Sequence, residues 1–179
     1  MTMKNTQHLE KAIRNIPDFP KPGILFRDIT TLLKDKKAFK TAVDAIVKKY
    51  KNKKIGKVVG VESRGFIVGA AVAYKLGAGF VPARKKGKLP CETLSVTYEL
   101  EYGTDTLEIH KDALDARDRV LIVDDLIATG GTVGGVIELV EQFKSRIVGI
   151  AFIIELVDLK GKDKLKGYPM SSLVKYEGE

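Results

Sequence analysis

The chain has 179 residues, 44% of them apolar, which corresponds to about one domain able to bury roughly 70% of the unfolded chain's surface. Its longest apolar stretch, at 147–154, is far shorter than the about 20 residues that cross a bilayer, and the amino-terminal sequence is too polar for a signal peptide. The lone Cys91 excludes an internal disulfide, and with His8 and His110 it offers no zinc-binding spacing. We therefore expect a cytoplasmic protein.

Lys and Arg number 31 against 23 Asp and Glu, a formal net charge of +8. Such a balance favours polyanionic partners: nucleic acid, an anionic membrane or a phosphorylated small molecule. Part of the excess lies in the lysine-rich segment 48–54, which follows a helical pattern and is typical of a solvated helix end. Charge alone does not choose among these partners.

The first third of the chain changes from helical to strand patterning. Apolar residues recur at helical spacing over 9–16, which predicts a first helix that ends at Pro17. Segment 17–30 is dense in Pro and Gly, so we expect an ordered loop there rather than a helix or a central strand. A second amphipathic helix is predicted over 39–50, followed by a buried strand at 57–61.

Two βαβ units are predicted from residue 57 onward, with an antiparallel, half-buried hairpin between them. The remaining elements are, in chain order, a helix at 65–76, a strand at 79–84, the hairpin at 93–110, a strand at 119–123, a helix at 132–143 and a strand at 147–156. Right-handed crossovers then predict an α/β fold with a twisted, mainly parallel sheet and helices on both faces. No repeat or linker suggests a second domain, so we assign 1–179 to one domain.

The segment most informative about chemistry is RVLIVDDLIATGGT, at 119–132. An apolar strand ends in Asp124 and Asp125, and a Gly-rich loop leads into a helix. Backbone N–H groups at such a helix start bind phosphate, while carboxylates just upstream can accept hydrogen bonds from ribose hydroxyls. The alternative is a tight turn in which Thr132 caps the helix, but a turn does not require two acids. We expect the sugar phosphate to contact Asp124, Asp125, Ala128, Thr129, Gly130, Gly131 and Thr132.

The stretch VLIVDDLIATGGT resembles the phosphoribosyl pyrophosphate signature of type I phosphoribosyltransferases. Five further segments, in the same order, resemble the adenine-using members of that family: PDFPKPGILFRDIT, GVESRGFIVGAAVA, RKKGKLP, LEYGTDTLEIHKDAL and ELVDLKG. The resemblance implies that fold, with a small hood and base-binding segment at 1–35 and a mobile, flexible hairpin at 88–110. It also implies an enzyme of purine salvage that converts adenine and phosphoribosyl pyrophosphate (PRPP) to AMP and pyrophosphate with Mg²⁺ held through the substrate. A homodimer is implied too, with no nucleic-acid or membrane partner.

Two segments, each with at least one cation, match the part of the family that holds pyrophosphate. Glu62, Ser63 and Arg64 lie between a strand and a helix, where amides and a guanidinium can bind pyrophosphate. An ordinary turn with Ser63 as helix cap is compatible with that role. Lys85 and Lys88 follow the next strand, at the same edge of the sheet, and we expect them to contact polyphosphate rather than only solvent. Arg64 is also assigned a catalytic role.

The segment GILFRD is expected to recognise the base. Adenine presents an N6 donor beside an N1 acceptor, which the backbone at Leu25 and Arg27 can complement; a mispaired base would cost roughly 1–3 kcal/mol. Phe26 is expected to stack on the purine rather than only anchor a core, and Leu159 to close the other side.

By resemblance, the hairpin supplies a lid. Glu101 is the candidate catalytic group that donates a proton or hydrogen bond to N7 of adenine, and Tyr102 would cover the site. Closure would shield the carboxylate, raise its pKa, and exclude water from a sugar cation.

Two other functions remain open at this point. A related transferase would use hypoxanthine, guanine, xanthine or a pyrimidine, against which GILFRD argues. A PRPP-sensing regulator on the same fold would bind RNA through the basic surface; a DNA-binding version would need an extra helix-turn-helix module.

Overall fold

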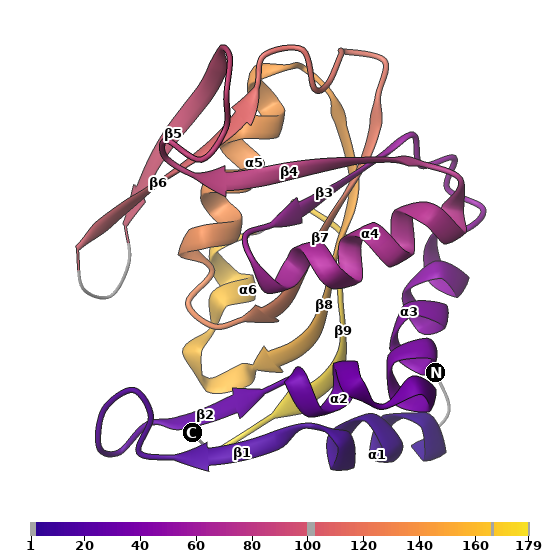
Figure 1. Ribbon diagram of the computed structural model, residues 1–179, viewed down its shortest axis with the longest axis vertical. Helices are drawn as coiled ribbons and strands as arrows, with labels where there is room; N and C mark the ends of the chain where they lie inside the picture. Colours follow the sequence, from indigo (N-terminus) through magenta and orange to yellow (C-terminus); the bar gives the residue numbers. More distant parts are fainter. Residues whose placement is uncertain (1–2, 100–102, 166, 179) are drawn as a thin grey trace.

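The computed structural model describes residues 3–99, 103–165 and 167–178, drawn in Figure 1. Its helices are α1 (Met3–Ala12), α2 (Thr30–Lys34), α3 (Lys36–Tyr50), α4 (Arg64–Leu76), α5 (Gly131–Gln142) and α6 (Gly161–Lys164), with a 3-10 turn, η1 (Val157–Leu159). Its strands are β1 (Arg14–Pro17), β2 (Leu25–Asp28), β3 (Lys57–Val61), β4 (Gly79–Lys85), β5 (Thr93–Glu99), β6 (Thr104–His110), β7 (Arg119–Ile127), β8 (Arg146–Leu156) and β9 (Met170–Tyr176). None of these helices has the length and apolar character needed to span a membrane.

The described strands form one large sheet, ordered β5-β6-β4-β3-β7-β8-β9, and a separate two-stranded sheet of β1 and β2. Strands β4, β3, β7, β8 and β9 run parallel, whereas β6 pairs antiparallel with β4 and with β5. The expected α/β class, the parallel sheet and the 93–110 hairpin are confirmed. Strand β9 was not predicted.

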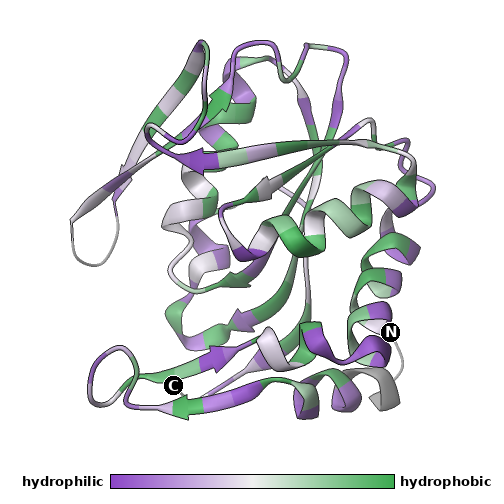
Figure 2. Ribbon diagram, in the orientation of Figure 1, coloured by the Kyte–Doolittle hydropathy of each residue, from purple (hydrophilic) through white to green (hydrophobic). Residues whose placement is uncertain are grey.

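Consecutive apolar residues give the parallel sheet two buried faces, because successive side chains of a strand point to opposite sides of the sheet. Val58 and Leu121 pack in a core with residues of α3 and α4, while Val59 and Ile122 pack in a second core with residues of α5. Figure 2 shows the same hydrophobic colouring along the central strands and on the helices beside them. Helices on both faces therefore follow from the sequence pattern, as expected.

The amino-terminal region differs from the prediction. Helix α1 ends at Ala12 rather than at Pro17, and β1 and β2 form an antiparallel hairpin in which Ile16 lies opposite Phe26. Residues before a proline disfavour helical dihedrals, and a proline is tolerated at an edge strand, so the chain extends there. The loop expected for 17–30 is thus confined to the turn between these two strands.

Strand β7 is longer than predicted. It continues through Asp124 and Asp125 to Ile127 because β8 remains paired beside it, with Asp124 opposite Phe152. The alternative in which Thr132 caps α5 is not observed, because Gly130 is its N-cap residue. Ser63 does occupy the N-cap position of α4, although its side chain makes no capping hydrogen bond.

Candidate functional site

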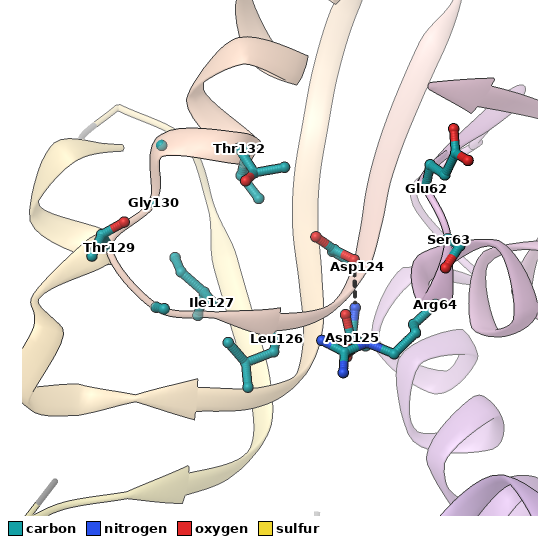
Figure 3. Close-up of a pocket in the computed structure, with 13 residues that line it drawn as sticks. Glu62, Ser63, Arg64, Asp124, Asp125, Leu126, Ile127, Thr129, Gly130 and Thr132 are labelled. Atoms are coloured by element: carbon teal, nitrogen blue, oxygen red, sulfur yellow. Dashed lines mark hydrogen bonds and ion pairs between the residues drawn. The ribbon is translucent and has the colours of Figure 1, made fainter. Parts of the chain in front are cut away.

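A cavity of about 240 Å³ opens at the carboxyl ends of β3 and β7. Two segments line it, 62–64 before α4 and 124–133 between β7 and α5. The residues predicted to bind ribose and 5′-phosphate therefore line the same cavity as Glu62, Ser63 and Arg64, three of the residues predicted to bind pyrophosphate. Figure 3 shows Arg64 reaching toward Asp125 and Thr132 across the cavity from Ser63.

Helix α4 starts against the end of β7 because Gly65 lacks a side chain. A Cβ atom at Gly65 would lie 2.8 Å from Asp124 Oδ1 and 2.9 Å from the carbonyl oxygen of Val123. This approach brings Arg64 Nε to 2.8 Å from Asp125 Oδ2. The structure thus joins the two predicted segments through an ion pair.

The two adjacent carboxyl groups are buried and titrate abnormally. Burial, and then the neighbouring Asp125, raise the pKa of Asp124 well above its ordinary value of 3.8. Burial also raises the pKa of Asp125, against the lowering effect of Arg64. Asp124 Oδ1 accepts a hydrogen bond from the Asp125 backbone N–H at 2.8 Å, while Asp125 Oδ2 has the ion pair but no hydrogen bond. We conclude that Asp124 is the carboxyl group more readily protonated, while Asp125 Oδ2 is buried against the Arg64 guanidinium.

The loop between β7 and α5 has the geometry of an anion site. Gly130 takes a left-handed conformation, with φ of 82°, and α5 starts at the next residue, so its unpaired N–H groups end at the cavity. The loop packs on a second backbone segment, since a Cβ at Gly130 would lie 2.6 Å from the Gly161 carbonyl oxygen. Tyr98 of β5 hydrogen-bonds Thr132 through their side chains.

The basic residues after β4 are connected to the cavity through Glu62. Arg84 donates to this carboxylate from Nε and Nη2, both at 3.2 Å, and the Lys85 backbone N–H donates to it at 2.9 Å. Burial raises the pKa of Glu62, but the hydrogen bonds from Arg84 and Lys85 together lower it by more than burial raises it. The net shift of the pKa is therefore downward. Arg84 also donates to the Lys88 carbonyl, at 3.1 Å. Lys85 and Lys88 are not part of the lining of the cavity, and Lys85 Nζ lies 3.0 Å from Asp105.

The hairpin of β1 and β2 carries the predicted base-binding residues. Phe26 lies edge-on to Phe19, and the Arg64 guanidinium carbon is 5.3 Å from the centre of the Phe26 ring. Arg27 is buried; it donates to Asn15 at 2.6 Å and stacks 3.8 Å from the centre of the Tyr176 ring. The structure therefore brings Phe26 beside the pyrophosphate segment.

Leu25 and Leu159 are exposed and lie outside the lining of the 240 Å³ cavity. Leu159 belongs to η1, whose other residues line a second cavity of about 380 Å³ that also reaches Ile127 and Ala128. The predicted catalytic residue Glu101 and the predicted lid residue Tyr102 lie outside the described residues. Among the described residues, no group of three or more His, Cys, Asp or Glu side chains is arranged to hold a metal ion.

Sequence reasoning missed several residues that position the site. Arg84 was assigned no role of its own, although it donates two hydrogen bonds to Glu62. The inward place of Tyr98 in the alternating β5 pattern marked it as buried, but its bond to Thr132 depends on tertiary structure. Asp105 and Gly161 lie in two of the segments that resemble the family, but neither residue was assigned a role.

Comparison with known proteins shows the family to which the chain belongs. The phosphoribosyl transferase domain family matches residues 30–177. An adenine phosphoribosyltransferase of Clostridium kluyveri is 59% identical over 170 residues, 95% of this chain and 99% of that protein. The crystal structure of the enzyme from Rhodothermus marinus has a TM-score of 0.93 at 49% identity, over 98% of this chain and 100% of its own. The crystal structure of the enzyme from Saccharomyces cerevisiae, complexed with an imino-altritol bisphosphate and adenine, has a TM-score of 0.91 at 43% identity, over 96% of this chain and 99% of its own. The chain belongs to the adenine phosphoribosyltransferase family.

Proposed function

We propose that this chain transfers the 5-phosphoribosyl group of PRPP to adenine, giving AMP and pyrophosphate. The observation that carries the proposal is the single cavity in which Arg64, the buried pair Asp124 and Asp125, and the loop 128–132 meet. Purine salvage is the consequence, because a free base is returned to the nucleotide pool.

The donor is held at three points in this proposal. Its 5′-phosphate accepts hydrogen bonds from the backbone of 128–132 at the start of α5, where the helix dipole also favours an anion. The ribose hydroxyls donate to Asp124 and Asp125, which both line the cavity. The pyrophosphate lies toward Ser63 and Arg64.

The transition state separates charge, positive on the ribose ring and negative on the leaving pyrophosphate. Arg64 stabilises the leaving group, as do Lys85 and Lys88 once the segment after β4 approaches it. The buried carboxylates favour the positive ring. Adenine N9 then bonds to C1′ from the opposite face as the C1′–O bond to pyrophosphate breaks, and the ring N–H proton of the free base is released to pyrophosphate or solvent. The mechanism therefore uses no protein nucleophile.

Mg²⁺ fits this donor set. Hard carboxylate oxygens lie beside the expected positions of substrate hydroxyl and phosphate oxygens, and Mg²⁺ prefers to keep waters and bind mainly through phosphates. When bound, it would neutralise developing charge on pyrophosphate. Asp124 and Asp125 would favour the ion through their charge, with the substrate supplying its direct ligands.

Adenine is proposed to bind between Phe26 and Leu159. Strand β2 pairs with β1 along one edge in the described structure, and its other edge offers backbone groups that Leu25 and Arg27 can present to N6 and N1. Stacking of Arg27 on Tyr176 supports a fixed backbone there. We assign the hood, 1–35, and the hairpin, 88–110, to the same domain of residues 1–179.

The lid and the assembly complete the proposal. Glu101 is the proposed proton or hydrogen-bond donor to N7, with Tyr102 covering the site. Helix α4 exposes Ile67 and Tyr74, seven residues apart on one face, which supports a homodimer that buries this face. The lone, exposed Cys91 is compatible with the reducing cytoplasm.

The test is an assay of the purified chain with Mg²⁺, PRPP and a panel of adenine, hypoxanthine, guanine, xanthine and uracil, with the products separated by chromatography. We expect AMP and pyrophosphate in equal amounts, with adenine strongly preferred. Turnover of another base in preference to adenine would contradict the base assignment. Absence of turnover together with salt-dependent RNA binding would instead support the regulatory alternative.

A further inference from the structure

A third cavity, of about 500 Å³, lies at the opposite end of the parallel sheet, where β7 and β8 begin. Its cationic lining comes from two places, the end of α3 with the turn after it, and the first residues of the two strands. The lining residues are Lys49, Tyr50, Lys53, Arg119, Arg146, Ile147, Val148, Gly167 and Pro169. Four cations and no carboxylate line this space.

The two arginines are placed side by side by strand register. Arg119 and Arg146 are Cα partners on neighbouring parallel strands, which lie about 4.8 Å apart, so both side chains leave the same face. Arg119 Nε donates to the Lys53 carbonyl at 2.9 Å, which fixes its guanidinium in the wall of the cavity. Like charges directly opposite each other destabilise a sheet unless an anion compensates them.

No compensating acid within the described residues pairs with these four cations, since none of the ion pairs there includes Lys49, Lys53, Arg119 or Arg146. Asp118 is the nearby acid: its carbonyl accepts from the Arg146 backbone N–H, while its carboxylate accepts from the Asp115 backbone N–H. The helix dipole accounts for lysines at the end of α3 but not for two arginines at strand starts.

The rest of the wall is apolar. Tyr50 is buried: its hydroxyl contacts Ser171 Oγ at 3.1 Å and donates to the Ile150 carbonyl at 3.3 Å, and its ring packs on Gly149, so it forms a fixed part of the wall. Ile147, Val148 and Pro169 continue this wall. A ligand that fits the cavity therefore combines several negative charges with an apolar part.

We propose that this cavity binds a nucleoside triphosphate, with its phosphates on Arg119 and Arg146 and its base against the apolar wall. The site is separate from the one proposed for PRPP, because the two cavities lie at opposite ends of β7. The proposal does not depend on the reaction proposed above.

The test is calorimetric titration of ATP into the whole chain in the presence of saturating AMP, which occupies the proposed active site. We expect saturable binding with one ATP per chain. Arg119→Gln combined with Arg146→Gln should weaken it by about tenfold or more, because charge-assisted bonds to phosphate are lost. Arg117→Gln is the matched control for a single arginine change. It removes one positive charge from an exposed position two residues before Arg119 and should leave ATP binding unchanged.

Arg146→Gln alone keeps the bond between Arg119 and Lys53, so it should weaken ATP binding even if the double variant is unstable. Tripolyphosphate lacks a base and should bind less tightly than ATP. Absence of saturable ATP binding, or equal loss in Arg117→Gln, would overturn the proposal. So would tripolyphosphate binding as tightly as ATP, or single-stranded RNA binding that is much tighter and lost in the same variants.

Discussion

The backbone of Gly161 lies directly against that of Gly130, so that neither residue has room for a side chain. A Cβ at Gly161 would lie 2.9 Å from the Gly130 nitrogen and closer still to the Ala128 carbonyl oxygen. Since Gly161 follows η1, this contact joins the segment that carries Leu159 to the loop proposed to hold the 5′-phosphate. The segments proposed to bind the base and the 5′-phosphate are therefore in direct backbone contact.

Gly161→Ala is expected to displace the phosphate loop. Because the obstructing atoms are backbone atoms, overpacking should cost about 1–3 kcal/mol and raise the KM for PRPP by about tenfold. Steady-state kinetics checks this. Gly134→Ala in α5 is the control, because its Cβ would meet only Leu165 Cδ2, at 3.9 Å, and its KM should stay near that of the original chain. Equal KM values for the two variants would contradict the inferred contact.

Changing Asp124 and Asp125 together to Asn should reduce kcat/KM by about 100-fold or more, because two carboxylates proposed to bind ribose and favour its positive charge become neutral. The double variant should remain folded, as the amides keep similar size and hydrogen-bonding oxygens. Kinetics and circular dichroism are the measurements. Activity equal to that of the original chain would remove both residues from the mechanism.

The single change Asp124→Asn should alter the pH dependence of stability. Burial and Asp125 raise the folded pKa of Asp124, so the folded state retains a proton that the unfolded state has lost. The free energy of unfolding of the original chain should then fall, relative to the variant, as pH rises above the ordinary value of 3.8, by about 1.4 kcal/mol for each pH unit until the folded group ionises. Urea unfolding at several pH values tests this; parallel profiles would contradict the raised pKa.

Asp28 should show the opposite dependence. Burial raises its pKa, but bonds from Arg14 and Thr30 hold the pKa at about 2. This stabilisation is complete above the ordinary value of 3.8 and decreases as pH falls toward about 2. Arg14 is half exposed, so Asp28→Asn should cost about 1–2 kcal/mol at neutral pH, and less below about pH 4. An unfolding difference that stays constant with pH would exclude this ion pair as its source.

Glu62→Gln should disturb the proposed pyrophosphate segment without touching the phosphate loop. The carboxylate accepts bonds from the Arg84 side chain and the Lys85 backbone, and an amide keeps one acceptor oxygen and no charge. The KM for pyrophosphate in the reverse reaction should rise by about tenfold. Glu92→Gln, which loses an exposed pair with Lys111, serves as the control and should behave as the original chain does.

Strands β3, β4, β7 and β8 were predictable because each is a run of apolar residues between turn signals, and the order of elements then required a parallel sheet. The end of β7 was not, because two acids in succession usually end a strand; here pairing with β8 extends it. Strand β9 was missed because Ser171, Ser172 and Lys175 interrupt its apolar pattern.

For the candidate site, the residues around Asp124 were predictable from a contiguous signature, and the structure places them on one cavity. Contacts between distant segments were not: Lys85 with Asp105, and Arg64 with Phe26, depend on how the sheet and the hairpin meet. Base contacts and lid closure stay predictions.

The hairpin of β1 and β2 is a sheet of its own, connected to the larger sheet through side chains such as Arg27 on Tyr176. The parts proposed to choose the base and to grip the sugar phosphate are thus supplied by separate stretches of polypeptide. Residues 14–28 could then be exchanged to accept a different heterocycle with little change to the groups proposed to bind the donor, provided that position 26 keeps a ring beside Arg64.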